Sequence, residues 1–277
     1  MKIFKVLSII LLFIFLTILT QIGGVLLFVF LCLSKAFQLH SVSQLWKRRV
    51  IKIVAFLVVY FVVTIFVVPP VAKFFGRVSL PILSHKVIKP HSCMTYLLNR
   101  HYVTLKMFET ITTVSHQFSD KYPNSEIRYL DANFPFLDEF PLLPHLSHDD
   151  GKKLDIALFY NDTKTKIPVN DAPSIIGYGV FEKPKKGEVN TAKRCMAQGK
   201  WQYSILEKII PQHKKEDFVF DQKRTKYFIQ LLTHHSSVQK IFIEPHLKTR
   251  MRLKNSKIRF HGCHAVRHDD HIHFQVN

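Results

Sequence analysis

The chain has 277 residues, of which 47% are hydrophobic and 21% charged, and it carries 39 lysine and arginine residues against 20 acidic ones. This composition excludes a disordered chain, which would contain few large apolar residues, and a collagen-like chain, which would show a glycine repeat. The net charge of +19 is compatible with nucleic-acid binding until the positions of the charges are considered.

Two uncharged apolar runs occupy most of residues 1–77 and predict transmembrane helices at about 6–34 and 53–72. Each run is long enough to cross a hydrocarbon core about 30 Å thick. The alternative for the first run is a cleaved signal peptide. Its apolar stretch is about twice the usual length, however, and no cleavage site with small residues follows before Lys35. We therefore expect a transmembrane hairpin that anchors the chain.

The segment between the two runs carries no acid and five basic residues: Lys35, Lys47, Arg48, Arg49 and Lys52. Short basic loops stay in the cytoplasm, so this segment predicts a cytoplasmic turn with both chain ends outside. Only Lys2, Lys5 and the terminal amino group oppose that orientation. The rest of the chain is accordingly expected on the external (periplasmic) side of the cell membrane, in a multi-pass protein.

Residues 78–92 contain two prolines and read as a juxtamembrane linker. The pattern of apolar residues beyond them predicts the following elements: helices over 104–120 and from Asp221 to about 232, and strands over 126–131, 153–160, 238–243 and 271–276. These elements predict one α+β domain over residues 93–277, with a central antiparallel sheet flanked by helices. Cys93, Cys195 and Cys263 allow one disulfide at most, and their spacing does not select the pair.

Histidine and aspartate gather in two distant places. The C-terminal stretch runs His268-Asp269-Asp270-His271-Ile272-His273, in which His271 and His273 would share one face of a strand. More than 100 residues earlier, His148 precedes a predicted strand whose polar face carries Asp155.

Imidazole and carboxylate ligands suit Zn²⁺, and three of them with a fourth position for water make a catalytic zinc site. The alternative is an exposed tail that chelates metal adventitiously. The second His/Asp cluster, at the start of a strand, argues against that alternative.

The order and spacing of these residues resemble a known zinc signature. Ser147-His148, then Asp155, then His271-x-His273 is similar to the signature of the lysostaphin/D-Ala-D-Ala metallopeptidase/hedgehog superfamily. Within it the chain looks most like the penicillin-insensitive murein endopeptidases, whose sites open with Ser-His and end in His-x-x-His-x-His, here His268, His271 and His273. Residues 238–248 resemble their strand-then-helix segment, and the resemblance covers residues 145–276.

The resemblance implies a membrane-anchored zinc peptidase that hydrolyses amide bonds in peptidoglycan peptides. Its Zn²⁺ ligands would be His148, Asp155 and His273. His271 would assist the attacking water as general base or donate to the oxyanion, with His268 as the second candidate.

One departure from the family concerns the base. The D-Ala-D-Ala peptidase branch has a glutamate three residues before its last ligand, where this chain has Asp270, which would face away from His273 on a regular strand. We therefore favour His271 over Asp270 as the base. Asp269 and Asp270 could equally orient imidazole rings.

Other functions remain open on the same residues. A D,D-carboxypeptidase or dipeptidase would use the same site, and a non-catalytic, metal-stabilised peptide-binding module would use the metal structurally. A nucleic-acid binder is not expected, because no helix-turn-helix, zinc-finger or RNA-binding signature is present. Ser147 lacks the motif of a nucleophile elbow, so we do not expect it to be a nucleophile. Cys263 is expected to be buried or disulfide-linked. The aromatic residues Tyr178, Trp201 and Tyr203 belong either to a substrate groove or to the core.

Overall fold

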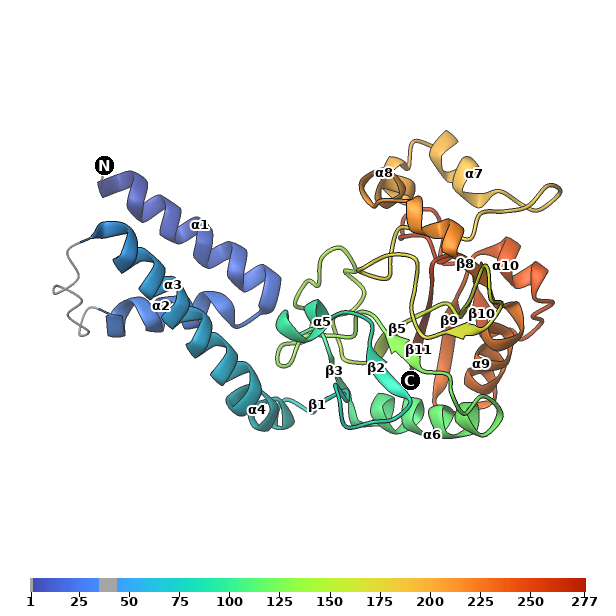
Figure 1. Cartoon of the computed structure of the whole chain (residues 1–277), viewed down its shortest axis with the longest axis horizontal. Helices are drawn as coiled ribbons and strands as arrows, with labels where there is room; N and C mark the ends of the chain where they lie inside the picture. The colour runs from blue at the N-terminus through green and yellow to red at the C-terminus, as the bar shows by residue number, and fades with distance from the viewer. Residues whose placement is uncertain (1, 35–43) are drawn as a thin grey trace.

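The computed structural model describes residues 2–34 and 44–277. Figure 1 shows a group of long N-terminal helices beside a domain of short helices and a sheet. The mixed α and β content of that domain agrees with the predicted class.

The described residues of the N-terminal part form four helices and one π-helical turn: α1 (Lys2–Thr20), α2 (Gly23–Ser34), α3 (Leu45–Val62), η2 (Val63–Val67) and α4 (Val68–Phe74). Two stretches, Ile3–Thr20 and Leu45–Phe74, are long and apolar enough to cross a membrane. The second begins earlier than the predicted 53–72, so Lys47, Arg48, Arg49 and Lys52 lie on α3 itself. Lys35 lies outside the described residues.

The prediction of one continuous helix over 6–34 is wrong. The chain turns at Gln21, whose φ of 65° is left-handed, and α2 then folds back along α1 (Figure 1). The Thr20 hydroxyl accepts the Gly23 N–H at 2.8 Å, which satisfies a donor at the start of α2. At Gly24, a Cβ atom would lie 1.9 Å from Thr17 Oγ1, so only glycine permits this close approach of the two helices.

The main sheet of the domain has six strands in the order β10-β9-β11-β5-β4-β2. Their bounds are β2 (Ile88–Pro90), β4 (Ile127–Tyr129), β5 (Lys153–Ala157), β9 (Val238–Phe242), β10 (Ile258–Arg259) and β11 (His271–Val276). The four central strands pair antiparallel as predicted, but β10–β9 and β4–β2 pair parallel, so the sheet is mixed. Because β2 lies in the predicted linker 78–92, that segment is an edge strand of the sheet and not a free connection.

The pairing of β5 with β11 decides which side chains share a face. Asp155 lies opposite His273, and Leu154 lies opposite Phe274. Leu154, Ile156 and Phe274 are fully buried in the core, where α6 (Leu105–Lys121) and α9 (Gln222–His234) cover the sheet. Strand side chains alternate between faces, so Asp155 and His273 point to the opposite face.

Shorter elements surround this sheet. They are β1 (Arg77–Ser79) paired with β3 (Tyr102–Thr104), the small sheet of β6 (Tyr160–Asp162), β7 (Pro168–Val169) and β8 (Phe218–Phe220), the helices α5 (Cys93–Leu97), α7 (Thr191–Ala197), α8 (Ile205–Ile209) and α10 (Pro245–Arg250), and the 3₁₀ turns η3 (Trp201–Ser204) and η4 (His213–Asp217). A disulfide joins Cys195 on α7 to Cys263, so the expectation of a buried or disulfide-linked Cys263 is confirmed, and Cys93 is a free thiol.

The N-terminal helices are packed against the domain. A small buried cluster joins Ile22, Tyr60 and Ala72 to Tyr102 of β3. The Tyr60 hydroxyl donates to the Leu97 carbonyl at 2.6 Å. The helices therefore contact the domain through buried side chains and not only through the connecting chain.

Candidate metal centre

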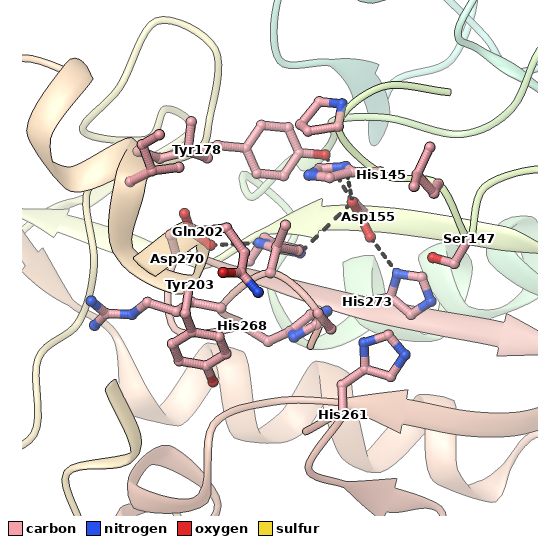
Figure 2. A pocket seen from close by; sticks show the side chains of 18 of the residues that line it. His145, Ser147, Asp155, Tyr178, Gln202, Tyr203, His261, His268, Asp270 and His273 are labelled. Carbon is pink, nitrogen blue, oxygen red and sulfur yellow. Dashed lines mark hydrogen bonds and ion pairs between the residues drawn. The ribbon is translucent and has the colours of Figure 1, made fainter. Parts of the chain in front are cut away.

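A cavity of about 530 Å³ opens over the polar face of β5 and β11. Its lining includes each predicted site residue: His148, Asp155, His268, Asp270, His271 and His273. Figure 2 shows His145, Tyr178 and His273 gathered around Asp155, with contacts from His145 and His273 reaching its carboxylate. The structure thus brings together residues that are more than 100 positions apart in the sequence.

The three predicted ligands meet at one point. His148 Nε2 lies 3.1 Å from His273 Nδ1 and 3.2 Å from Asp155 Oδ1, and His273 Nδ1 lies 2.8 Å from the same oxygen. All three side chains are at most 3% exposed. Two imidazole nitrogens and a carboxylate oxygen at these separations can share one cation.

The orientation of the His148 ring is fixed by a backbone hydrogen bond on the side away from Asp155. Its Nδ1 donates to the carbonyl oxygen of Ala132 at 2.7 Å, so Nε2 is the nitrogen that faces Asp155. A ligand histidine held by a backbone carbonyl in this way presents a defined nitrogen to a metal.

Charge interactions inside the site centre on the Asp155 carboxylate. Burial alone would lower the pKa of His148, but the Asp155 carboxylate raises it above its usual value. Burial likewise acts to raise the pKa of Asp155, yet His148 and His271 hold it well below its usual range. Asp155 is therefore ionised and faces positively polarised groups.

The second oxygen of Asp155 is held by two residues. The Tyr178 hydroxyl donates to Oδ2 at 2.8 Å, and His145 Nδ1 lies 3.1 Å from the same oxygen. His145, His148 and Asp155 form a buried group whose ligand atoms all lie within 4.8 Å of one another, and this group can hold a metal ion. Within the described part of the chain neither ring nitrogen of His145 has hydrogen-bond geometry with a partner, so its approach to Oδ2 is an ion-pair contact.

His145 was missed as a site residue in the sequence. Its signal was the spacing His145-x-x-His148 in the turn before the strand, which places two imidazoles at one end of β5. Tyr178 was assigned to either groove or core, and the structure shows it in the cavity wall, in contact with Asp155.

His271 stands beside the ligand group. Its Nδ1 lies 2.5 Å from Asp270 Oδ1, and its Nε2 lies 3.7 Å from Asp155 Oδ2 without a hydrogen-bond partner. Burial acts to lower its pKa, but the carboxylates of Asp155 and Asp270 raise it to about 9. Asp270 also accepts the Gly179 N–H at 2.6 Å, so it is fixed on the far side of the His271 ring.

His268, the second candidate for the base, and Asp269, a candidate for orienting an imidazole ring, lie in different surroundings. The His268 ring packs 4.9 Å from the His271 ring, and burial together with the charges of His271 and His273 lowers its pKa well below the usual value. Asp269 does not orient a ring of the ligand group, because it forms a buried pair with Arg267 at 2.6 Å. Of the two carboxylates considered for orienting imidazoles, only Asp270 contacts a site histidine directly.

Arg267 is the only arginine or lysine among the described residues that line the cavity. Its guanidinium is paired with Asp269, lies 3.2 Å from Glu207 and stacks 3.8 Å above the Phe181 ring. The positive charge is thus compensated within the wall and is not available to a ligand carboxylate.

A comparison with models of protein families gives no match, and a comparison with curated proteins gives none either.

Proposed function

We propose that the chain is a membrane-anchored zinc peptidase that hydrolyses amide bonds in peptidoglycan peptides. The observation that carries this proposal is the convergence of His148 Nε2, Asp155 Oδ1 and His273 Nδ1 at the base of an open cavity. A bound zinc ion polarises carbonyl groups and makes water a nucleophile near neutral pH.

His271 handles the proton in this proposal. Asp270 holds its Nδ1, so its unpaired Nε2 faces the ligand group from the side. A group in this place accepts a proton from an attacking water in its neutral form, and donates a hydrogen bond to an oxyanion in its charged form. Asp270 acts through His271 as a positioning residue.

The cavity wall favours an endopeptidase over a D,D-carboxypeptidase. A carboxypeptidase has to recognise a free terminal carboxylate, which is usually done by an arginine or lysine. Arg267 is already paired with Asp269 and Glu207, and the described lining offers no other such cation. We infer that the bound segment lies within a peptide and does not end next to the cleaved bond.

One observation favours a non-catalytic, metal-stabilised module. If His145 ligates together with His148, Asp155 and His273, the shell has four protein ligands and leaves no position for water. The contact of His145 with Oδ2, the oxygen of Asp155 that faces away from His148 and His273, instead supports an orienting role. We therefore keep the module as the second candidate.

The fold of α1 and α2 supports an external domain. Because α2 folds back along α1, the chain start with Lys2 and Lys5 lies at the end of the helices remote from the domain, as does the basic start of α3 (Figure 1). All these positive charges then lie on one side, which the positive-inside rule assigns to the cytoplasm. This arrangement replaces the hairpin with both ends outside, and the Cys195–Cys263 disulfide suits the oxidising side.

Mass spectrometry of muropeptides tests the activity. Purified peptidoglycan is incubated with the full chain, with His148→Ala and with His234→Ala, an exposed histidine on α9. We expect opened cross-links with the parent and His234→Ala and none with His148→Ala. Equal products from all three chains would contradict the proposal, and loss of terminal D-alanine alone would show a carboxypeptidase.

A further inference from the structure

The segment from α7 to α8 exposes large apolar side chains. Trp201 is 68% exposed, Ile209 63% and Met196 44%. Trp201 and Ile209 lie at the two ends of the stretch η3–α8, which also supplies Gln202, Tyr203, Ile205 and Leu206 to the cavity wall. The exposed apolar surface is therefore the outer side of the wall that encloses the candidate site.

The same segment is basic. Residues 191–209, from α7 to α8, contain four basic residues and one acidic residue, a net charge of +3 in 19 positions. Lys193 and Lys208 are exposed, and within the described part of the chain neither has a carboxylate at ion-pair distance. Lys200 and Lys208 directly precede Trp201 and Ile209 in the sequence, so a basic residue adjoins each of these exposed apolar side chains.

The position of the N-terminal helices bears on which face of the domain would meet a membrane. Figure 1 shows α1 and α3 running obliquely toward the domain, with α7 and α8 at the edge of the domain opposite α6. In this view α7 and α8 lie on the side of the domain nearer to α1, whereas α6 lies on the side nearer to α4 (Figure 1).

We propose that α7, η3 and α8 rest on the anionic lipid surface of the membrane that holds the N-terminal helices. Tryptophan prefers the membrane interface, and lysine is attracted to anionic headgroups. An anionic polymer would account for the lysines alone, whereas a lipid surface accounts for Trp201 and Ile209 as well. The tether keeps the segment at a high effective concentration near the bilayer.

This contact would place one wall of the cavity against the membrane surface. If the proposed function is correct, the preferred substrate is a peptide that is itself attached to membrane lipid, and mature wall distant from the bilayer is a poorer substrate. This statement on the substrate rests on the proposed function, whereas the membrane contact does not.

The test uses the two tryptophans of the chain, Trp46 and Trp201. The full chain with Trp46→Phe, in which Trp201 is the only tryptophan, is reconstituted in phosphatidylcholine–phosphatidylglycerol vesicles whose acyl chains carry bromine. We expect the brominated lipid to reduce Trp201 fluorescence severalfold. In a Trp201→Phe chain, quenching of Trp46 confirms that the N-terminal helices are inserted.

Charge reversal on the segment and on a remote helix provides the matched comparison. Lys193→Glu with Lys208→Glu should remove most of the quenching, whereas Lys223→Glu with Lys226→Glu, on α9, should leave it unchanged. If Trp201 is not quenched in a chain whose N-terminal helices are inserted, the proposal is overturned. Binding of soluble polyglutamate by such an unquenched chain would show that the lysines bind an anionic polymer and not lipid. Quenching that both double variants leave intact would also overturn it. His148→Ala should be quenched like its parent, so failure of the peptidase proposal is separately visible.

Discussion

The Tyr178 hydroxyl donates a 2.8 Å hydrogen bond to Oδ2 of Asp155, the carboxylate oxygen that does not face His148 and His273. The same hydroxyl accepts the Asp131 N–H at 3.1 Å, so Tyr178 is itself held by the backbone. Asp155 is thereby fixed with Oδ1 toward the two histidines. This relationship makes Tyr178 a residue that orients a candidate ligand.

Tyr178→Phe should lower the affinity for zinc by about 10–100-fold, because residues that orient a metal ligand typically contribute that much. The ring remains, so the packing against His145 and His271 is retained. The measurement is a zinc titration in competition with a chromophoric chelator. Tyr203→Phe removes a hydroxyl that is bonded to Glu244 and is the control, with unchanged affinity expected. Equal affinities in the parent and Tyr178→Phe would exclude the orienting role.

His145→Phe distinguishes orientation from ligation. If His145 only holds Oδ2 of Asp155, the variant still binds one zinc per chain at saturation, with an affinity reduced about tenfold. The measurement is metal content after equilibration with excess zinc. A chain unable to retain zinc at any concentration would instead make His145 a ligand and favour the non-catalytic module.

The Cys195–Cys263 disulfide should stabilise the wall that carries α7. The two cysteines are 68 residues apart, and closing a loop of that length stabilises the folded state by about 2–4 kcal/mol. Cys195→Ser should lower the free energy of unfolding in denaturant by that amount, whereas Cys93→Ser should leave it unchanged. A parent chain whose unfolding is insensitive to reductant would show that the bond does not form.

His101 should make the protein less stable in acid. Its ring is fully buried between Tyr96 and Tyr102, and burial lowers its pKa from 6.5 to about 3. Between these values the unfolded chain binds a proton that the folded chain does not, so stability falls as the pH falls below about 6.5. At about pH 5 the loss due to this residue is about 2 kcal/mol.

The variant His101→Phe removes that proton uptake and should be relatively more stable at about pH 5 than at about pH 8. Unfolding midpoints of the parent and variant at the two pH values measure the difference, with the exposed His234→Ala as control. A parent and variant with the same pH dependence would contradict a buried neutral His101.

The sequence predicts the two strands that carry the site because both are short alternating segments. Leu154 and Ile156 mark the core face of β5, which leaves Asp155 on the other face. The alternation of apolar and polar residues does not predict that β5 pairs with β11, because that register is set by core contacts between segments more than 100 residues apart. The motif resemblance supplied the expectation that Asp155 and His273 meet.

The features that the sequence did not predict have local physical causes. The first apolar run is uniformly hydrophobic, and hydropathy alone does not show that Gln21 turns the chain and that Gly24 lets α2 pack on α1. His145 was overlooked because its partner oxygen belongs to a residue ten positions ahead, and only the folded turn brings them together. The parallel outer strands depend on short segments, β2 and β10, with too few residues to show a period.

The most direct test of the account is the zinc content of the purified chain. Parent, His148→Ala, His273→Ala and His234→Ala are equilibrated with zinc, freed of excess metal and analysed by inductively coupled plasma mass spectrometry. We expect one zinc per chain in the parent and in His234→Ala, and almost none in His148→Ala and His273→Ala. Full zinc content in both of those variants would contradict the proposed site.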